Sequence, residues 1–122
     1  MTKVFVSGSR SVRELPQAAR TSLNNITTLG FTICVGDCYG VDTLVQAYLA
    51  AKNYQRVVVF HIGERPRHNL GFRAVRVSGS RQTDKDAAMA DAAYYGLAIW
   101  DGRSPGTQKN IARVAKTKVL RG

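Results

Sequence analysis

Residues 31–42 read FTICVGDCYGVD, a largely apolar run followed by a loop that contains two glycines and ends in aspartate. Two other stretches repeat this character, VFVSGSR at 4–10 and LAIWDGRSPGT at 97–107. Short apolar runs of this kind are typical of buried strands, and nearly continuous apolarity is typical of a parallel sheet that is covered on both faces. The three stretches therefore predict parallel strands whose following loops meet at one edge of the sheet.

Helical signals alternate with these strands. We expect helices at about 14–29, 43–52, 82–94 and 108–117. We expect strands at 4–6, 31–35, 56–61 and 97–100, with a short edge strand at 119–120. Residues 62–80 are rich in arginine and show no clear periodicity, which is typical of a functional or mobile loop. The pattern predicts an α/β fold, a Rossmann-like three-layer sandwich with a parallel sheet of about 4–5 strands, and residues 1–122 fit a single domain.

The composition indicates a basic globular protein. Eighteen Lys and Arg residues against eight Asp and Glu give a net charge of +10, which favours phosphate-bearing or polyanionic partners. No apolar run approaches the length of a membrane span, and the N-terminus leads directly into a strand, so we expect a cytoplasmic protein with no membrane partner. Cys34 and Cys38 are too few for a structural zinc site, so we expect reduced thiols and no metal, with a reactive Cys38 as the alternative.

The three strand-to-helix loops predict a phosphate site. Glycines let backbone N–H groups approach a phosphate closely, and the free N–H groups at a helix start point towards it. Ser9, Ser104 and Thr107 offer hydroxyl donors, and Arg10 offers a charged guanidinium. The chain contains neither GxGxxG nor GxxxxGK[ST], so a standard dinucleotide fingerprint and a Walker P-loop are both disfavoured.

Three segments carry a family resemblance: DAAMA at 86–90, YGLAIWDGRSPGT at 95–107 and NI at 110–111. Together they resemble the SLOG superfamily, which includes the LOG phosphoribohydrolases and the DNA-processing protein DprA. The loops at 6–10 and 36–42 are similar to the first two ligand loops of that group, and FHIGERPRHN at 60–69 is similar to its branch of small proteins. The resemblance covers nearly the whole chain and implies a Rossmann-like fold that binds a nucleotide or a nucleotide-derived ligand.

The sequence departs from the enzymes of that family after Gly106-Thr107. LOG enzymes carry acidic residues there, whereas this chain continues with Gln108-Lys109-Asn110, and an amide cannot act as a carboxylate base or nucleophile. We therefore expect a ligand-binding module or sensor that requires no cofactor. An N-glycosidic hydrolase acting on nucleotides stays open, with Asp101 and Asp86 as the catalytic candidates and Asp37 and Asp42 as further carboxylates. DprA-like nucleic-acid binding through the basic surface is a third hypothesis.

We expect the following residues to contact the ligand: Gly8, Ser9, Arg10, Gly36, Tyr39, Gly40, Asp42, Arg81, Asp101, Gly102, Ser104, Gly106, Thr107 and Asn110. Among them, Arg81 would supply charge together with Arg10, and Asp101 would contact a sugar hydroxyl. Tyr39 fits base stacking and plain loop packing equally, and Asp42 also fits a helix cap. A homodimer is a further expectation, because the segment 119–120 leaves an edge of the sheet to cover.

Overall fold

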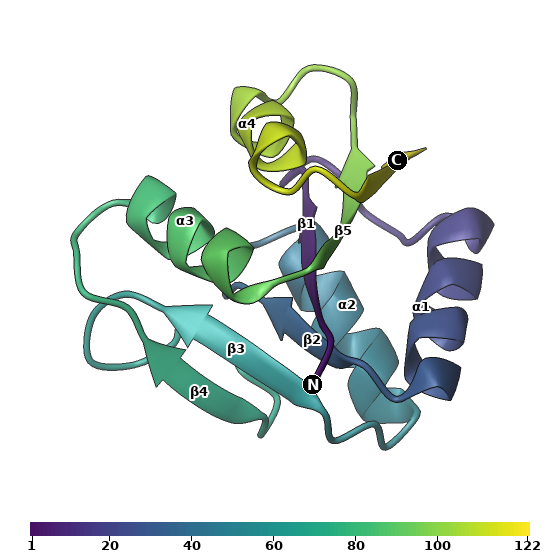
Figure 1. The fold of residues 1–122 in the computed structure, drawn as a ribbon, viewed down its shortest axis with the longest axis horizontal. Helices are drawn as coiled ribbons and strands as arrows, with labels where there is room; N and C mark the ends of the chain where they lie inside the picture. The colour runs from purple at the N-terminus through teal and green to yellow at the C-terminus, as the bar shows by residue number, and fades with distance from the viewer.

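The computed structural model describes residues 1–122, which form a six-stranded sheet and four helices (Figure 1). The strands are β1 (Lys3–Gly8), β2 (Thr32–Val35), β3 (Val57–His61), β4 (Arg73–Arg76), β5 (Tyr95–Trp100) and β6 (Thr117–Arg121). The helices are α1 (Gln17–Leu29), α2 (Val41–Ala51), α3 (Gln82–Ala92) and α4 (Pro105–Arg113). None of the four helices is long and apolar enough to cross a membrane.

All six strands are parallel, in the order β4-β3-β2-β1-β5-β6. The predicted α/β class and parallel sheet are confirmed, but the predicted strand count was too low. The missing strand is β4, which lies within the aperiodic stretch 62–80 and pairs only with β3. As an edge strand it has the sequence RAVR with three of its four residues exposed, so it carries no apolar run for a pattern to detect.

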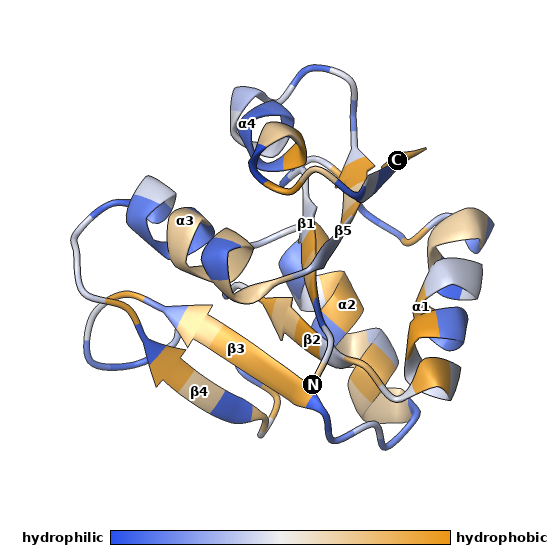
Figure 2. Cartoon of the chain, viewed as in Figure 1, coloured by the Kyte–Doolittle hydropathy of each residue, from blue (hydrophilic) through white to orange (hydrophobic).

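The core consists of two apolar clusters, one on each face of the sheet. On one face, strand residues such as Val4 and Val6 pack against Leu23 of α1 and Leu49 of α2. On the other face, Phe5, Cys34 and Phe60 pack against Met89 of α3 and Val114, which follows α4. Successive residues of a strand point to opposite faces, so β1 contributes to both clusters. The inner strands are apolar along most of their length for this reason, as β3 shows in Figure 2.

Several predicted helix boundaries were wrong. Helix α1 begins at Gln17 because Pro16 takes the extended N-cap position. Helix α2 begins two residues before the predicted 43, and α3 ends at Ala92. The largest error concerns α4, which spans Pro105–Arg113 where 108–117 was predicted, because proline is well suited to the first turn of a helix. Residue 117 belongs instead to β6, which is longer than the predicted 119–120.

The order of the strands determines where a ligand can enter. From β1 the chain moves outward through β2, β3 and β4, and α3 then returns it to β5 on the opposite side of β1. The loops that follow β1 and β5 therefore leave neighbouring strands in different directions. Such a topological switch point opens a crevice at the carboxyl edge of a parallel sheet.

Candidate functional site

A cavity of about 450 Å³ lies at this switch point. Its wall includes residues 7–11 after β1, Cys38 and Asp42 around the start of α2, and residues 104–107 at the start of α4. Helix α3 closes another side with Gln82, Asp86 and Met89, and Phe5 adds an apolar side chain. The predicted convergence of three strand-to-helix loops is thus present, and most of the lining residues are polar.

Hydroxyl groups join the β1 and α4 sides of the cavity. Ser9 is 1% exposed, and its Oγ lies 3.4 Å from the Thr107 Oγ1 and accepts a hydrogen bond of 3.0 Å from the Asp101 backbone N–H. Gly106, in the first turn of α4, also lines the cavity, and a Cβ added there would meet no atom within 4 Å. This wall therefore combines buried hydroxyls with an unobstructed helix start, the arrangement that suits an anion.

Asp101 does not line the cavity. Its Oδ1 accepts hydrogen bonds of 2.8 Å from the backbone N–H groups of Arg103 and Ser104, and its Oδ2 accepts the hydroxyls of Ser11 at 2.7 Å and Ser104 at 2.9 Å. These bonds, led by the one from the Ser104 N–H, hold the pKa of Asp101 well below its usual range. Its carboxylate positions the β5–α4 loop, and the predicted contact with a sugar hydroxyl stays a prediction.

Two of the predicted glycines are explained by packing between loops. A Cβ on Gly8 would lie 2.4 Å from a side-chain carbon of Val41, so the end of β1 touches the first residue of α2. Gly40 has a positive φ of 81°, and a Cβ there would lie 2.5 Å from the Arg10 Cα. These glycines let the β1 and β2 loops pack against each other; Gly8 also lines the cavity, whereas Gly40 shapes it indirectly.

Two carboxylates, Asp42 and Asp86, face the cavity. Burial raises the pKa of Asp42 from its ordinary value of 3.8 to about 6, although the nearby Lys85 and the Cys38 N–H, which donates to Asp42 at 3.0 Å, act in the opposite direction. Burial also raises the pKa of Asp86, opposed first by the Asn110 side chain. Carboxyl groups shifted upward in a cleft are frequent at functional sites.

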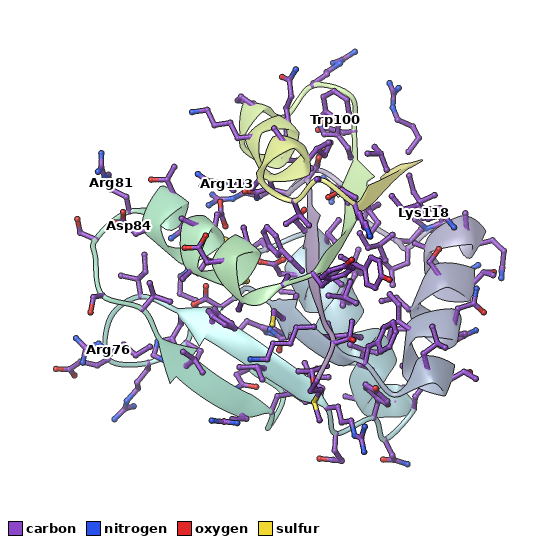
Figure 3. All side chains as sticks on the ribbon, in the orientation of Figure 1. Arg76, Arg81, Asp84, Trp100, Arg113 and Lys118 are labelled. Atoms are coloured by element: carbon purple, nitrogen blue, oxygen red, sulfur yellow. The ribbon has the colours of Figure 1, made fainter.

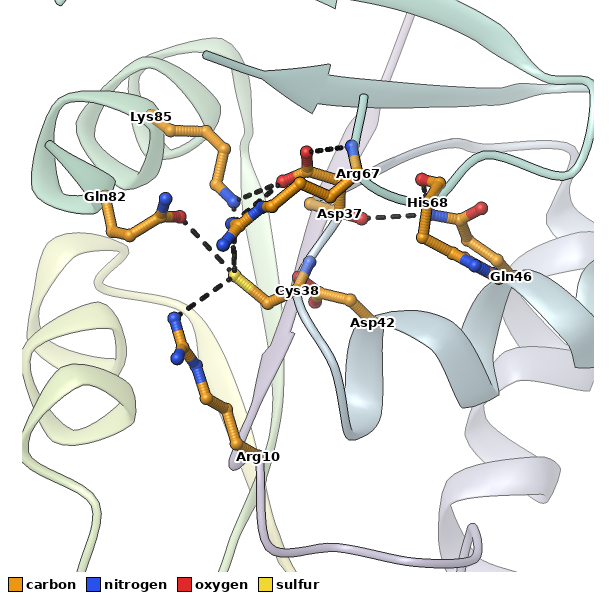
Figure 4. A network of polar contacts seen from close by, with 10 residues as sticks. Arg10, Asp37, Cys38, Asp42, Gln46, Arg67, His68, Gln82 and Lys85 are labelled. Carbon is orange, nitrogen blue, oxygen red and sulfur yellow. Dashed lines mark hydrogen bonds and ion pairs between the residues drawn. The ribbon is translucent and has the colours of Figure 1, made fainter. Parts of the chain in front are cut away.

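A buried ion pair supports this wall. Lys85 of α3 is 1% exposed, and its Nζ lies 2.9 Å from the Oδ1 of Asp37, which is 2% exposed (Figure 4). Arg67 joins them, donating to Asp37 from its backbone N at 2.8 Å and from Nη2 at 3.3 Å. Burial acts to raise the pKa of Asp37, but the bonds from Lys85 and Arg67 outweigh it and hold the pKa at about 2. The ion pair between Lys85 and Asp37 holds α3 against the loop that follows β2.

The structure brings eight of the fourteen predicted ligand residues into the cavity lining: Gly8, Ser9, Arg10, Asp42, Ser104, Gly106, Thr107 and Asn110. The catalytic candidate Asp86 also lines it. Six predicted residues lie outside the lining: Gly36, Tyr39, Gly40, Arg81, Asp101 and Gly102. The Arg81 side chain is exposed and points away from the molecule, and its backbone N–H instead bonds to Asp84 at the start of α3 (Figure 3).

Sequence reasoning missed most of the α3 wall and Cys38. A usable signal existed for α3, because Gln82, Asp86 and Met89 are spaced by four and three residues and so share one face of a helix. No such signal linked Lys85 to Asp37, which is 48 residues away in sequence. No group of three or more His, Cys, Asp or Glu side chains is arranged to hold a metal ion.

The fold and the site define a class of protein: a Rossmann-like parallel α/β structure with a polar cavity at its topological switch point. Comparison with known proteins adds no family to this description, since no family model and no curated protein matches the chain. The resemblance to the SLOG superfamily stays a prediction.

Proposed function

We propose that this chain binds a nucleotide or nucleotide-derived ligand in the switch-point cavity and acts as a ligand-binding module or sensor. The observation that carries the proposal is the position of the cavity, at the carboxyl end of β1 and against the open start of α4, the helix that follows β5. Its volume of about 450 Å³ lies within the range of small-molecule sites.

The phosphate of the ligand would lie against the α4 wall. Ser9, Ser104 and Thr107 offer hydroxyls there, and the first N–H groups of α4 add their partial positive charge. Arg10 lines the same cavity, is exposed, and makes no ion pair, because the two ion pairs of the structure both involve Asp37. Its guanidinium contacts the Cys38 Sγ at 3.8 Å but has no carboxylate partner, so it can pair with a phosphate.

A thermal-shift titration tests the proposal. The panel comprises nucleoside phosphates, ADP-ribose and NAD, with the matching unphosphorylated nucleosides as controls. We expect a saturable rise in melting temperature with a phosphorylated ligand and a much smaller response to its nucleoside. A protein that responds to no phosphorylated compound, or equally to nucleoside and nucleotide, would contradict the phosphate placement.

A matched pair of variants locates the phosphate. Arg10→Gln removes the free guanidinium from the cavity, and we expect affinity for the nucleotide to fall by about tenfold, as for loss of a charge-assisted hydrogen bond. Arg13→Gln removes an equal charge from an exposed residue of the same loop that does not line the cavity. Equal affinity loss in both variants would indicate general electrostatic attraction instead of a defined contact.

A second function, hydrolysis of an N-glycosidic bond, is favoured by the two cavity carboxylates. Asp86, one of the two predicted catalytic candidates, and Asp42, one of the further carboxylates, both line the cavity, and burial raises the pKa of both. A carboxyl group whose pKa lies close to the working pH is suited to general acid–base catalysis.

Release of free base from nucleoside monophosphates, followed by chromatography, distinguishes the enzyme from the binding module. If the chain is a hydrolase, Asp86→Asn and Asp42→Asn each abolish release, whereas Asp91→Asn on the exposed side of α3 does not. If nucleotide binds but no free base is released, only the ligand-binding function is supported.

A further inference from the structure

Three cationic side chains converge on the sulfur of Cys38 (Figure 4). The Sγ lies 3.1 Å from Nη2 of Arg67, 3.3 Å from Nζ of Lys85 and 3.8 Å from Nη2 of Arg10. These side chains come from the β3–β4 loop, α3 and the β1 loop, respectively, so the fold brings them together from distant parts of the sequence.

Three carboxylates lie near this sulfur, but none of them bonds to it. Asp37 pairs with Lys85 and Arg67, Asp42 accepts the Cys38 backbone N–H, and Asp86 lines the same cavity. The partners of the sulfur are the three cations and the Gln82 Oε1 at 3.4 Å, and Arg10 makes no ion pair. Cationic donors beside a sulfur stabilise a thiolate, which is the nucleophilic form of cysteine.

Access to the thiol comes through the cavity. Cys38 is only partly buried and is one of the residues that line it. A second observation indicates that this cavity receives a molecule. Asn110, on the α4 side, is 8% exposed, lines the cavity, and its Oδ1 has no hydrogen-bond partner. A buried amide oxygen without a donor is costly, and a bound molecule with an N–H or O–H group would satisfy it.

The second cysteine provides a contrast within the same chain. Cys34 is 1% exposed, lies in β2 and packs in the apolar cluster under α3. Burial raises the pKa of its thiol to about 11, although Lys3 acts in the opposite direction. Cys34 therefore stays protonated and unreactive at neutral pH, and it serves as an internal reference.

We propose that Cys38 is a site of oxidation by hydroperoxides, activated by Arg10, Arg67 and Lys85. The thiolate sulfur attacks one oxygen of hydrogen peroxide, an S–O bond forms, and the O–O bond breaks. Hydroxide leaves and takes a proton from solvent to become water. The sulfur is oxidised to a sulfenic acid and the peroxide is reduced, so that thiol and peroxide give sulfenic acid and water.

Oxidation places an additional oxygen inside the cavity wall. Because Cys38 and Arg10 both line the cavity and touch each other, the new oxygen competes for the guanidinium that the phosphate would use. Oxidation is therefore expected to weaken ligand binding and to act as a redox switch. This consequence rests on the proposed function, whereas the oxidation itself does not.

The test uses the full chain and reads modification of each cysteine by mass spectrometry. After treatment with hydrogen peroxide and trapping with dimedone, we expect the adduct on Cys38 and none on Cys34. With iodoacetamide at neutral pH, we expect Cys38 to react at least about 100-fold faster than Cys34. Absence of a dimedone adduct on Cys38 would overturn the proposal.

Charge variants separate activation by the cations from simple accessibility. Arg67→Gln and Arg10→Gln each remove one cation beside the sulfur, and we expect each to slow iodoacetamide labelling of Cys38 by about fivefold or more. Arg65→Gln, in the same exposed loop as Arg67, is the matched control and leaves the rate unchanged. Unchanged labelling in both Arg67→Gln and Arg10→Gln would refute the role of the cations.

The failure of this proposal is distinguishable from the failure of the proposed function. Labelling and oxidation need no nucleotide, whereas the thermal-shift panel is run on the reduced protein. If the oxidised protein binds nucleotide as well as the reduced protein does, the proposed redox switch is refuted, but the oxidation and the nucleotide binding are not.

Discussion

Replacing Asp42 by asparagine is expected to stabilise the protein at neutral pH. The carboxylate lines the cavity, and burial raises its pKa from 3.8 to about 6. An aspartate whose pKa is higher in the folded state binds more protons when folded, so the folded protein loses stability as pH rises from about 4 to about 6 and does not regain it above that range. Asparagine removes the charge, and its Oδ1 can still accept the Cys38 N–H bond that Asp42 accepts at 3.0 Å.

The size of the effect follows from the two pKa values. The free energy of unfolding should rise by about 3 kcal/mol at about pH 7.5 and by about 1 kcal/mol at about pH 4.5. Partial solvation of the carboxylate would reduce both free-energy changes but leave the change at about pH 7.5 the larger. Urea denaturation followed by circular dichroism at the two pH values measures them, and Asp91→Asn on exposed α3 surface controls for net charge. An Asp42→Asn variant that is less stable at about pH 7.5, or whose gain is larger at the lower pH, would refute the reasoning.

Three further predictions concern the buried ion pair, the packing of Gly8 and the net charge of the chain. Asp37→Asn leaves the Lys85 ammonium buried without its counterion, so the free energy of unfolding should fall by about 3–5 kcal/mol in urea denaturation, and a loss below 1 kcal/mol would contradict the buried pair. Gly8→Ala places a Cβ against Val41 and should lower that free energy by about 1–3 kcal/mol, whereas unchanged stability would show that the loops move apart easily. If the net charge of +10 supports nucleic-acid binding, affinity for a labelled oligonucleotide should fall steeply between low and physiological salt, and salt-independent binding would contradict it.

The sequence was sufficient to predict the fold class because the four inner strands are buried on both faces. Such strands are nearly continuous apolar runs, and TICV of β2 is entirely buried. Strand β4 escaped prediction for the opposite reason, since an edge strand with outward arginines carries neither continuous apolarity nor a clean alternation. The pattern of a strand reflects its place in the sheet, which the local sequence of β4 did not reveal.

The part of the site that is built from loops directly after strands could be predicted from the sequence. The loops after β1 and β5 lie at the same edge in any parallel sheet, so Ser9, Ser104 and Thr107 were foreseeable. The hydrogen bonds by which Asp101 holds its own loop were not foreseeable, because a position after β5 suits a ligand contact and a loop cap equally well. The ion pair between Lys85 and Asp37 depends on tertiary packing of α3, which no local pattern records.

The most direct test of the central claim is a calorimetric titration of a nucleotide into Gly106→Leu. Gly106 lies in the first turn of α4, lines the cavity, and has open space around its Cα, so the fold should tolerate leucine while its side chain fills the phosphate position. Ala112→Leu, exposed on the same helix and outside the cavity lining, is the control. We expect Gly106→Leu to remain folded and to lose nucleotide binding while Ala112→Leu keeps it. A folded Gly106→Leu variant that binds with unchanged affinity would contradict the placement of the ligand at the start of α4.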